Sequence, residues 1–187
     1  MQYDLYDFDG TVYSKETESQ FYLYCLLRRP YILPLLPFQL LSLVCRFTAR
    51  ARAQWMARWF CFLRFVDGPK LAARFWAAHK RYIRLIDDPA SRPRPVAICS
   101  TTPVFLLAPV CAMFGVDCVI GTDIDPRTGR STGDILRGQA KVPAIHAALP
   151  DAQFVRAYSD RPVLDAPMLA LAQEQYQVHK DGSLTRL

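Results

Sequence analysis

Residues 3–12 read YDLYDFDGTV, and the interpretation of the whole chain starts from this stretch. Tyr3–Phe8 is typical of a short strand, and Asp9-Gly10-Thr11 ends it with a turn. Two carboxylates that lie two residues apart, Asp7 and Asp9, can approach one ligand only if the backbone turns between them. Gly10 permits such a turn and lets main-chain N–H groups come close to an anion. The stretch therefore predicts a ligand site at the end of the first strand.

The character of the sequence changes twice after this strand. From about Glu16 to Asp88 the apolar and aromatic residues follow a helical period, and breaks divide the segment into roughly four helices. The Pro-rich segment Asp88–Pro95 is the clearest linker. Beyond it, strands alternate with helices, which predicts an α/β fold with a largely parallel sheet. The expected strands are 96–99, 116–120, 154–158 and 176–179, and a turn is expected at 125–129. The expected helices are 103–115, 138–149 and 163–173. Thr102 is expected to cap the first of these helices, with Pro103 in its first position.

Further polar side chains follow the predicted strands or begin the predicted helices. They are Ser100, Lys141, Asp160 and Asp165. Ligands of parallel sheets bind at the carboxyl ends of the strands, so these groups are expected to meet Asp7 and Asp9 there. Converging carboxylates repel one another unless a cation is present, and oxygen-only ligation favours Mg²⁺. With a lysine and phosphate-binding donors added, the set predicts a magnesium-assisted phosphoryl-transfer site with a carboxylate nucleophile.

Taken singly, each of these groups also has a plain structural interpretation. An acidic turn can follow an edge strand, a serine after a strand is commonly a turn residue, and a lysine in a helix is commonly a surface residue. The order of the groups and their places at strand ends favour the catalytic interpretation.

Four segments resemble the four motifs of the haloacid dehalogenase superfamily. They read YDFDGTVY, VAICSTTP, GQAKVPAI and YSDRPVLDAPML in this chain. The resemblance is to the phosphatases that carry a helical cap between the first and second motifs, as phosphoserine-phosphatase-like enzymes do. It implies a Rossmann-like catalytic core with a parallel sheet, formed by residues 1–13 and 95–187. An inserted α-helical cap would comprise residues 14–94.

The resemblance also implies a role for each motif residue. Asp7 would attack phosphorus and become an aspartyl phosphate, and Asp9 would protonate the leaving alcohol and then activate water. Mg²⁺ would be held by the carboxylates of Asp7 and Asp160 and by the main-chain carbonyl of Asp9. Phosphate binding is implied for Gly10, Thr11, Ser100, Thr101 and Lys141. Asp165 would orient metal-bound water or Lys141; four residues separate it from Asp160, where three are common in the family.

The composition fits a folded enzyme with an unevenly distributed charge. Half of the 187 residues are hydrophobic, which is enough for a core and excludes a disordered chain. The net charge is +6, yet residues 28–94 carry 14 Lys and Arg against three acids, a net +11, while the rest of the chain sums to −5. All three tryptophans lie in this basic block. A basic, aromatic-rich block is typical of a surface that meets an anionic partner.

Three interpretations of the basic block remain open. In the first, the predicted cap meets an anionic membrane surface and the substrate is a lipid phosphomonoester; Arg28-Arg29-Pro30, the stretch LPLLPFQLLSLV and the closing YQVHKDGSLTRL resemble phosphatidylglycerophosphatase C. In the second, the cap is a helical bundle with an Arg-coated exterior, and the substrate is a small soluble phosphomonoester such as a phosphoserine-like compound or a sugar phosphate. In the third, the chain is a non-enzymatic module that binds nucleic acid or another anionic surface. Nucleic acid is not an expected partner, because a binding module needs no Asp7/Asp9 pair.

The remaining features bear on location and metal type. Met1–Asp9 lacks the basic start and apolar stretch of a signal peptide, so a cytoplasmic protein is expected. A location at the inner face of the membrane is the alternative that stays open. Six cysteines form no CxxC pair, which disfavours a zinc site. Pro30–Cys45 is uncharged over 16 residues and too short to cross a bilayer of about 30 Å, but an interfacial or re-entrant segment stays open.

Overall fold

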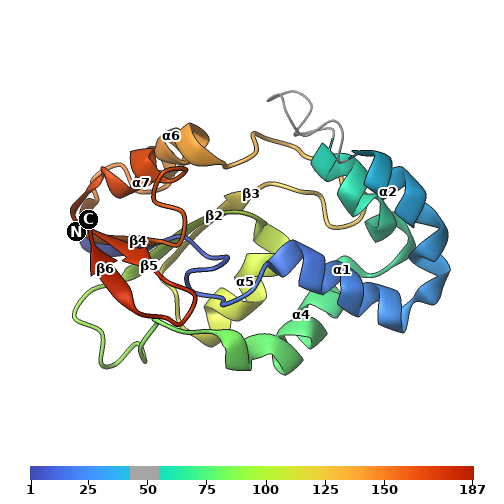
Figure 1. Ribbon diagram of the computed structural model, residues 1–187, viewed down its shortest axis with the longest axis horizontal. Coiled ribbons are helices and arrows are strands. Elements are labelled where there is room, and N and C mark those ends of the chain that lie inside the picture. Colours follow the sequence, from blue (N-terminus) through green and yellow to red (C-terminus); the bar gives the residue numbers. More distant parts are fainter. Residues whose placement is uncertain (43–54) are drawn as a thin grey trace.

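The computed structural model of the protein describes residues 1–42 and 55–187. A six-stranded sheet in the order β3-β2-β1-β4-β5-β6 forms its centre (Figure 1). The first five strands along the chain pair in parallel, and β6 pairs with β5 in the antiparallel direction. The strands are β1 (Gln2–Tyr6), β2 (Val96–Pro103), β3 (Cys118–Thr122), β4 (Gln153–Ser159), β5 (Ala172–Val178) and β6 (Leu184–Arg186). The predicted α/β class is confirmed.

The register of the central strands places the first motif at the carboxyl edge of the sheet. Tyr6, the last residue of β1, lies opposite Ile98 of β2 and Tyr158 of β4. The main-chain N–H of Asp7 still donates to the carbonyl of Tyr158 at 2.9 Å. Because β1 ends there while both neighbours run on, the chain after Asp7 lies between the ends of β2 and β4.

The segment between β1 and β2 is helical, as its sequence period predicts (Figure 1). It contains α1 (Thr17–Arg28), the 3₁₀ turn η1 (Pro30–Leu35), α2 (Leu36–Ser42), η3 (Phe60–Phe65), α4 (Gly68–His79) and η4 (Lys80–Tyr82), and residues 55–59 are helical too. The later helices are α5 (Val104–Met113), the 3₁₀ turn η5 (Gly138–Ala140), α6 (Lys141–Ala148) and α7 (Ala166–Leu169). The division into a core and a separate cap remains a prediction.

Apolar side chains cover both faces of the sheet, because alternate residues of a strand point to opposite sides. On β2, Val96 and Ile98 face one cluster, which also takes in α5 and the helical segment. Ala97 and Cys99 face the other cluster, which contains residues of α6 and α7. The sheet is therefore the middle layer, with α5 and the helical segment against one face and α6 and α7 against the other.

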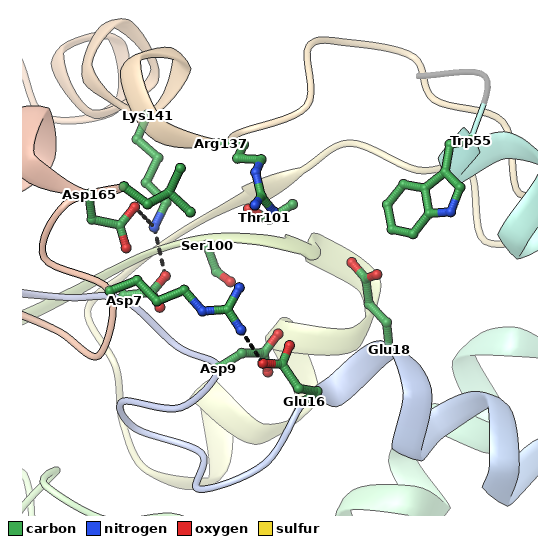
Figure 2. Close-up of a pocket in the computed structure, with 12 residues that line it drawn as sticks. Asp7, Asp9, Glu16, Glu18, Trp55, Ser100, Thr101, Arg137, Lys141 and Asp165 are labelled. Atoms are coloured by element: carbon green, nitrogen blue, oxygen red, sulfur yellow. Dashed lines mark hydrogen bonds and ion pairs between the residues drawn. The ribbon is translucent and has the colours of Figure 1, made fainter. Parts of the chain in front are cut away.

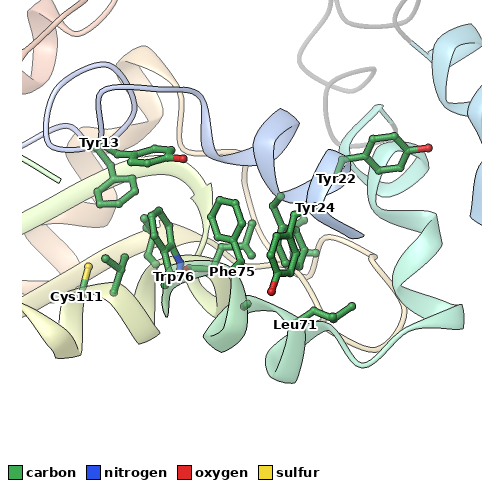
Figure 3. Packing of buried hydrophobic residues seen from close by; sticks show 14 of the residues in the cluster. Tyr13, Tyr22, Tyr24, Leu71, Phe75, Trp76 and Cys111 are labelled. Carbon is green, nitrogen blue, oxygen red and sulfur yellow. The ribbon is translucent and has the colours of Figure 1, made fainter. Parts of the chain in front are cut away.

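Aromatic rings join the helical segment to the first motif (Figure 3). Trp76 of α4 is fully buried and packs edge-on against Phe8 and Tyr13, with ring centroids 5.7 and 5.0 Å apart. Its indole N–H donates to the carbonyl of Leu106 in α5 at 2.6 Å. Trp76 of α4 is therefore in direct contact with Phe8, the residue between Asp7 and Asp9.

Two element predictions were wrong. Pro103 is the last residue of β2 and the N-cap of α5, and the Thr102 hydroxyl donates to Asp9 instead of capping that helix. The expected helix 163–173 is a short one, α7, followed by β5 from Ala172. Parallel pairing with β4 along residues 172–177 extends this strand, and a pairing partner distant in sequence is invisible to a helical propensity count.

The described helices include none with the length and apolar content needed to cross a bilayer. In the uncharged stretch 30–45, the chain forms η1 and then α2, and residues 43–45 lie outside the described residues.

Candidate active site

A cavity of about 140 Å³ opens at the carboxyl edge of the sheet (Figure 2). Parallel strands bring their carboxyl ends to the same edge, which is where ligands of such sheets bind. The cavity is lined by the predicted site residues Asp7, Asp9, Ser100, Thr101, Lys141 and Asp165. It is also lined by Glu16, Glu18, Trp55, Arg137, Arg161 and Leu164, which the sequence analysis did not single out.

A buried lysine joins two carboxylates at the base of this cavity (Figure 2). Lys141, the first residue of α6, places its Nζ 2.7 Å from Asp7 Oδ1 and 2.9 Å from Asp165 Oδ1. All three side chains are buried. Burial alone would lower the pKa of Lys141, but the charges of Asp7 and Asp165 outweigh it and raise that pKa, so the ammonium stays charged.

Burial raises the pKa of Asp7, and the neighbouring ammonium of Lys141 opposes this rise. Lys141 therefore favours the ionised form of Asp7, which is the form that can attack an electrophile. Asp165 accepts a second hydrogen bond, from Ser159 Oγ at 2.7 Å, which fixes the carboxylate that in turn orients Lys141.

Asp9 is held by two threonines on different elements. Its Oδ1 accepts hydrogen bonds from the main-chain N–H of Thr17, at 2.9 Å, and from the Thr17 hydroxyl. Its Oδ2 accepts from the Thr102 hydroxyl at 2.7 Å. Thr17 begins α1, so the Asp9 carboxylate receives a hydrogen bond from the start of that helix, whose own N-cap Glu16 makes no side-chain cap. Burial raises the pKa of Asp9 to about 7, against the lowering effect of these hydrogen bonds.

The turn after Asp9 lies directly against Asp160. Gly10 has φ +75°, and a Cβ at this position would lie 2.3 Å from Asp160 Oδ2, so only glycine fits. Thr11 Oγ1 accepts a hydrogen bond from the main-chain N–H of Asp160 at 2.9 Å. The N–H groups of Gly10 and Thr11 donate within the loop, to the carbonyls of Tyr13 and Phe8. The structure thus places Gly10 and Thr11 beside Asp160 and away from the cavity wall, and their contact with phosphate remains a prediction.

Ser100 and Thr101 contribute hydroxyl groups from the end of β2. Ser100 is buried, and its Oγ accepts the main-chain N–H of Thr102 at 3.1 Å, which leaves its own O–H able to donate into the cavity. Thr101 Oγ1 donates to the carbonyl of Leu136 at 2.8 Å. Thr102 was missed as a site residue, although it lies two positions after Ser100 on the same strand and therefore on the same face.

Charged residues surround the mouth of the cavity. Arg161 pairs with Glu16 and lies 3.5 Å from Asp160 Oδ2, and Arg137 is exposed. Burial raises the pKa of Glu18 to about 8, with a further contribution from Asp9. Arg161 lies within the fourth motif, next to Asp160, whereas Glu16, Glu18 and Arg137 lie outside the motifs and reach the cavity only through the fold.

The carboxylates at this edge fit a divalent cation. Burial raises the pKa of Asp160 to about 6, with the charge of Asp7 adding to the effect, and its Oδ1 is buried without a hydrogen-bond partner in the described part of the chain. An orphaned carboxylate oxygen beside a second carboxylate is what an oxygen-ligated cation would satisfy. Residues 1–42 and 55–187 hold no cluster of three or more His, Cys, Asp or Glu side chains suited to a metal. The predicted ligand set is of a different kind, with two such side chains and a main-chain carbonyl as the third ligand.

Comparisons with solved structures find similar folds in bacterial proteins. A Bordetella pertussis Tohama I protein of unknown function matches at 21% identity with a TM-score of 0.63, over 93% of this chain and 88% of that one. A phosphoserine phosphohydrolase-like protein from Francisella tularensis matches at 15% identity with a TM-score of 0.59, over 94% and 86%. A probable phosphoserine phosphatase from Vibrio cholerae matches at 14% with a TM-score of 0.63, over 93% of this chain but 55% of that one.

No curated protein matches the chain. The family model for haloacid dehalogenase-like hydrolases matches residues 5–170, which include all nine predicted site residues. That range covers most of the chain and runs from the first carboxylate motif to the one around Asp160 and Asp165. The protein is therefore a hydrolase that belongs to the haloacid dehalogenase-like family.

Proposed function

We propose that the protein is a Mg²⁺-dependent phosphomonoester hydrolase that works through an aspartyl phosphate on Asp7. The observation that carries this proposal is the placement of Asp7 and Asp9 in one cavity, each held by different partners. Asp7 is paired with the buried ammonium of Lys141 at 2.7 Å, whereas Asp9 is held by hydroxyl groups. Two carboxylates in such different environments suit two different roles, a nucleophile and an acid.

In the first step, a carboxylate oxygen of Asp7 attacks phosphorus, and the bond from phosphorus to the ester oxygen breaks. The departing alkoxide takes a proton from Asp9, so the alcohol leaves neutral. Ser100 donates to a phosphoryl oxygen, and the Lys141 ammonium offsets the negative charge that collects on Asp7 and the phosphoryl group.

In the second step, water attacks the aspartyl phosphate and Asp9 accepts its proton, which releases phosphate and restores Asp7. A carboxyl group with a pKa of about 7 can donate and then accept a proton near neutral pH. Mg²⁺ would be held by Asp7, by Asp160 and by the carbonyl of Asp9, and when bound it would neutralise the charge shared by the carboxylates and the phosphate dianion.

The substrate is proposed to be a lipid phosphomonoester at an anionic membrane surface. Large apolar side chains are exposed along three consecutive elements, α1, η1 and α2, a set we call the α1–α2 apolar surface: Leu23, Leu27, Tyr31, Leu33, Phe38, Leu40 and Leu41, with exposed fractions from 48% to 74%. Arg28 and Arg29 are exposed in the middle of this set. Exposed apolar side chains beside cations complement an anionic bilayer, which offers both hydrocarbon and negative headgroups.

A small soluble phosphomonoester is the alternative substrate. The observation that favours it is the modest volume of the cavity, about 140 Å³, in which a phosphoryl group and a short leaving group would fill most of the space.

Replacing the nucleophile tests the central step. Asp7→Asn keeps the size of the side chain and removes the attacking oxyanion, so turnover of any active phosphomonoester should drop to background. Asp4→Asn is the matched control, because Asp4 is a buried carboxylate of β1, the strand that precedes Asp7, and its partner is Arg94, at 2.9 Å, away from the cavity. It should lower the free energy of unfolding but leave kcat within a few-fold. Near-normal turnover in Asp7→Asn would contradict the mechanism.

The role of Asp9 is tested by varying the leaving group. Asp9→Asn should reduce kcat for an alkyl phosphate by roughly 10²–10⁴-fold, because proton transfer to the alkoxide is lost. The loss should be much smaller for p-nitrophenyl phosphate, whose leaving group needs little protonation. Rate constants for both substrates, measured on the same enzyme preparation, give the comparison. Equal losses for the two would assign Asp9 another role.

The metal requirement is tested by chelation and by Asp160. Activity should vanish in EDTA and return with Mg²⁺, and Asp160→Asn should weaken Mg²⁺ binding by more than the roughly 10–100-fold that loss of an outer-shell partner costs. Calorimetric Mg²⁺ titrations measure this, with Asp151→Asn, an exposed site before β4, as the unchanged control. Full activity in EDTA after dialysis would rule out the metal.

Binding to vesicles tests the lipid substrate. The protein should sediment with phosphatidylglycerol-containing vesicles, less so at high salt, since exposed charges are screened over about 8–10 Å at physiological ionic strength. Arg28→Glu/Arg29→Glu should weaken binding by at least about 30-fold, at roughly 1 kcal/mol per basic residue. Lys70→Glu/Arg74→Glu makes the same change of net charge on the exposed side of α4 and should have a smaller effect.

Turnover separates the two substrate classes in the same variants. Arg28→Glu/Arg29→Glu should lose activity on a vesicle-borne phosphomonoester and keep it on p-nitrophenyl phosphate, because the cavity residues are untouched. Absence of vesicle binding at every salt concentration, together with a preference for soluble esters, would leave the soluble substrate as the answer.

A further inference from the structure

Arg84, which lies outside the four motifs, forms hydrogen bonds with the loop that carries the first motif. Arg84 lies between η4 and β2, and its guanidinium donates to three main-chain carbonyls. Nη2 lies 2.6 Å from the carbonyl oxygen of Gly10, Nε 2.9 Å from that of Thr11, and Nη1 2.9 Å from that of Lys180. The planar guanidinium offers a rigid fork of donors, which matches two successive carbonyls in a way that a lysine ammonium does not.

The backbone around Arg84 is also tied to the same loop. Its main-chain N–H donates to the carbonyl of Val12 at 2.8 Å, and the N–H of Ser14 donates to the carbonyl of Tyr82 at 3.1 Å. The next residue, Leu85, has φ +64°, which is costly for a leucine and persists only where the surroundings enforce it. The chain therefore accepts local strain at the point where Arg84 meets residues 10–14.

Gly10 and Thr11, whose carbonyls accept hydrogen bonds from Arg84, are also in contact with Asp160. Gly10 lies so close to the Asp160 carboxylate that a Cβ would be 2.3 Å from it, and the Thr11 hydroxyl accepts the Asp160 N–H at 2.9 Å. A shift of the Gly10 and Thr11 carbonyls would therefore move Asp160 relative to Asp7 and Asp9. Arg84 itself does not line the cavity that contains Asp7 and Asp9.

We propose that Arg84 is a positioning residue, which holds the Gly10–Thr11 backbone so that Asp7, Asp9 and Asp160 keep their relative positions. It acts through the loop and never touches the substrate. Because Arg84 follows the helical segment in the chain, it also makes the geometry of the carboxylates depend on where that segment ends. This proposal rests on the proposed function for the reaction that Arg84 serves, but its effect on the loop can be measured without that reaction.

The chain offers a matched control. Arg92, in the same connection to β2, also donates to two successive carbonyls, those of Phe114 and Gly115 at 3.0 and 2.7 Å, far in sequence from residues 7–13. Arg84→Met and Arg92→Met both remove a carbonyl-binding guanidinium and keep an unbranched stem. Both variants should therefore lose a comparable part of the free energy of unfolding.

Only Arg84→Met should alter the loop and the site. Hydrogen exchange of peptides that cover residues 7–13 should accelerate at least about tenfold under native conditions, because the loop opens locally more often. The Mg²⁺ dissociation constant should rise by about 10–100-fold, the range seen when outer-shell support is removed. At saturating Mg²⁺, kcat should fall up to about 100-fold with KM within a few-fold, because a misplacement of about 1 Å costs on that order. Arg84→Lys should recover part of each loss.

The outcomes separate this proposal from the proposed function. If Arg84→Met and Arg92→Met show the same hydrogen exchange in residues 7–13 and the same Mg²⁺ dissociation constant, Arg84 is merely structural and the inference is overturned. If wild-type protein hydrolyses no phosphomonoester, the proposed function fails, while exchange and Mg²⁺ titration still decide the role of Arg84. Should Arg84→Met fail to fold, Arg84→Lys carries the test: unchanged loop exchange together with unchanged Mg²⁺ affinity would overturn the proposal.

Discussion

The buried ammonium of Lys141 is the constraint on which the site depends. Removing a charge from water costs several kcal/mol, and only close opposite charges repay it. Asp7 and Asp165 supply them at 2.7 and 2.9 Å, from the end of β1 and the start of α7. The end of β1 and the starts of α6 and α7 must therefore lie where both ion pairs can form. Loss of either carboxylate would leave a buried charge half compensated, so the same contacts that suit the chemistry also stabilise this edge of the sheet.

Asp9 makes the chemistry depend on the helical segment as well. One of its oxygens accepts hydrogen bonds from Thr17 at the start of α1, and the other from Thr102 at the end of β2. Asp9, the proposed acid–base group, thus connects the sheet to the first helix of the segment. Phe8, beside it, packs against Trp76 of α4. A shift of α1 or α4 would change the surroundings of Asp9, so in the proposed mechanism the position of the helices would influence proton transfer at the sheet.

The sequence predicted the parts of this arrangement that depend on local pattern. Asp7 and Asp160 could be recognised because each follows a short strand that a turn closes, and parallel pairing then brings those strand ends together. Ser100 was recognised as following a strand over 96–99, although β2 continues past it to Pro103. The contacts of Thr102 and Arg84 could not be recognised, since a threonine beside a proline also fits a helix cap, and the partners of Arg84 are main-chain carbonyls 73 to 96 residues away. The helix expected over 163–173 ran into the start of β5, and the strand expected over 176–179 covered only its end, because the pairing of residues 172–177 with β4 is not visible to local propensity.

The structure also changes what the basic block means. Three of its arginines are used inside the molecule: Arg84 and Arg92 bind carbonyls, and Arg94 pairs with Asp4. These charges hold the connection to β2 and are not available to a bilayer, so the net charge of residues 28–94 overstates their attraction for a membrane. The exposed side chains of the α1–α2 apolar surface therefore support the proposed lipid substrate more strongly than the net charge does. Leaving leucine and tyrosine in water brings a folded monomer no stability, whereas burying them in an interface would.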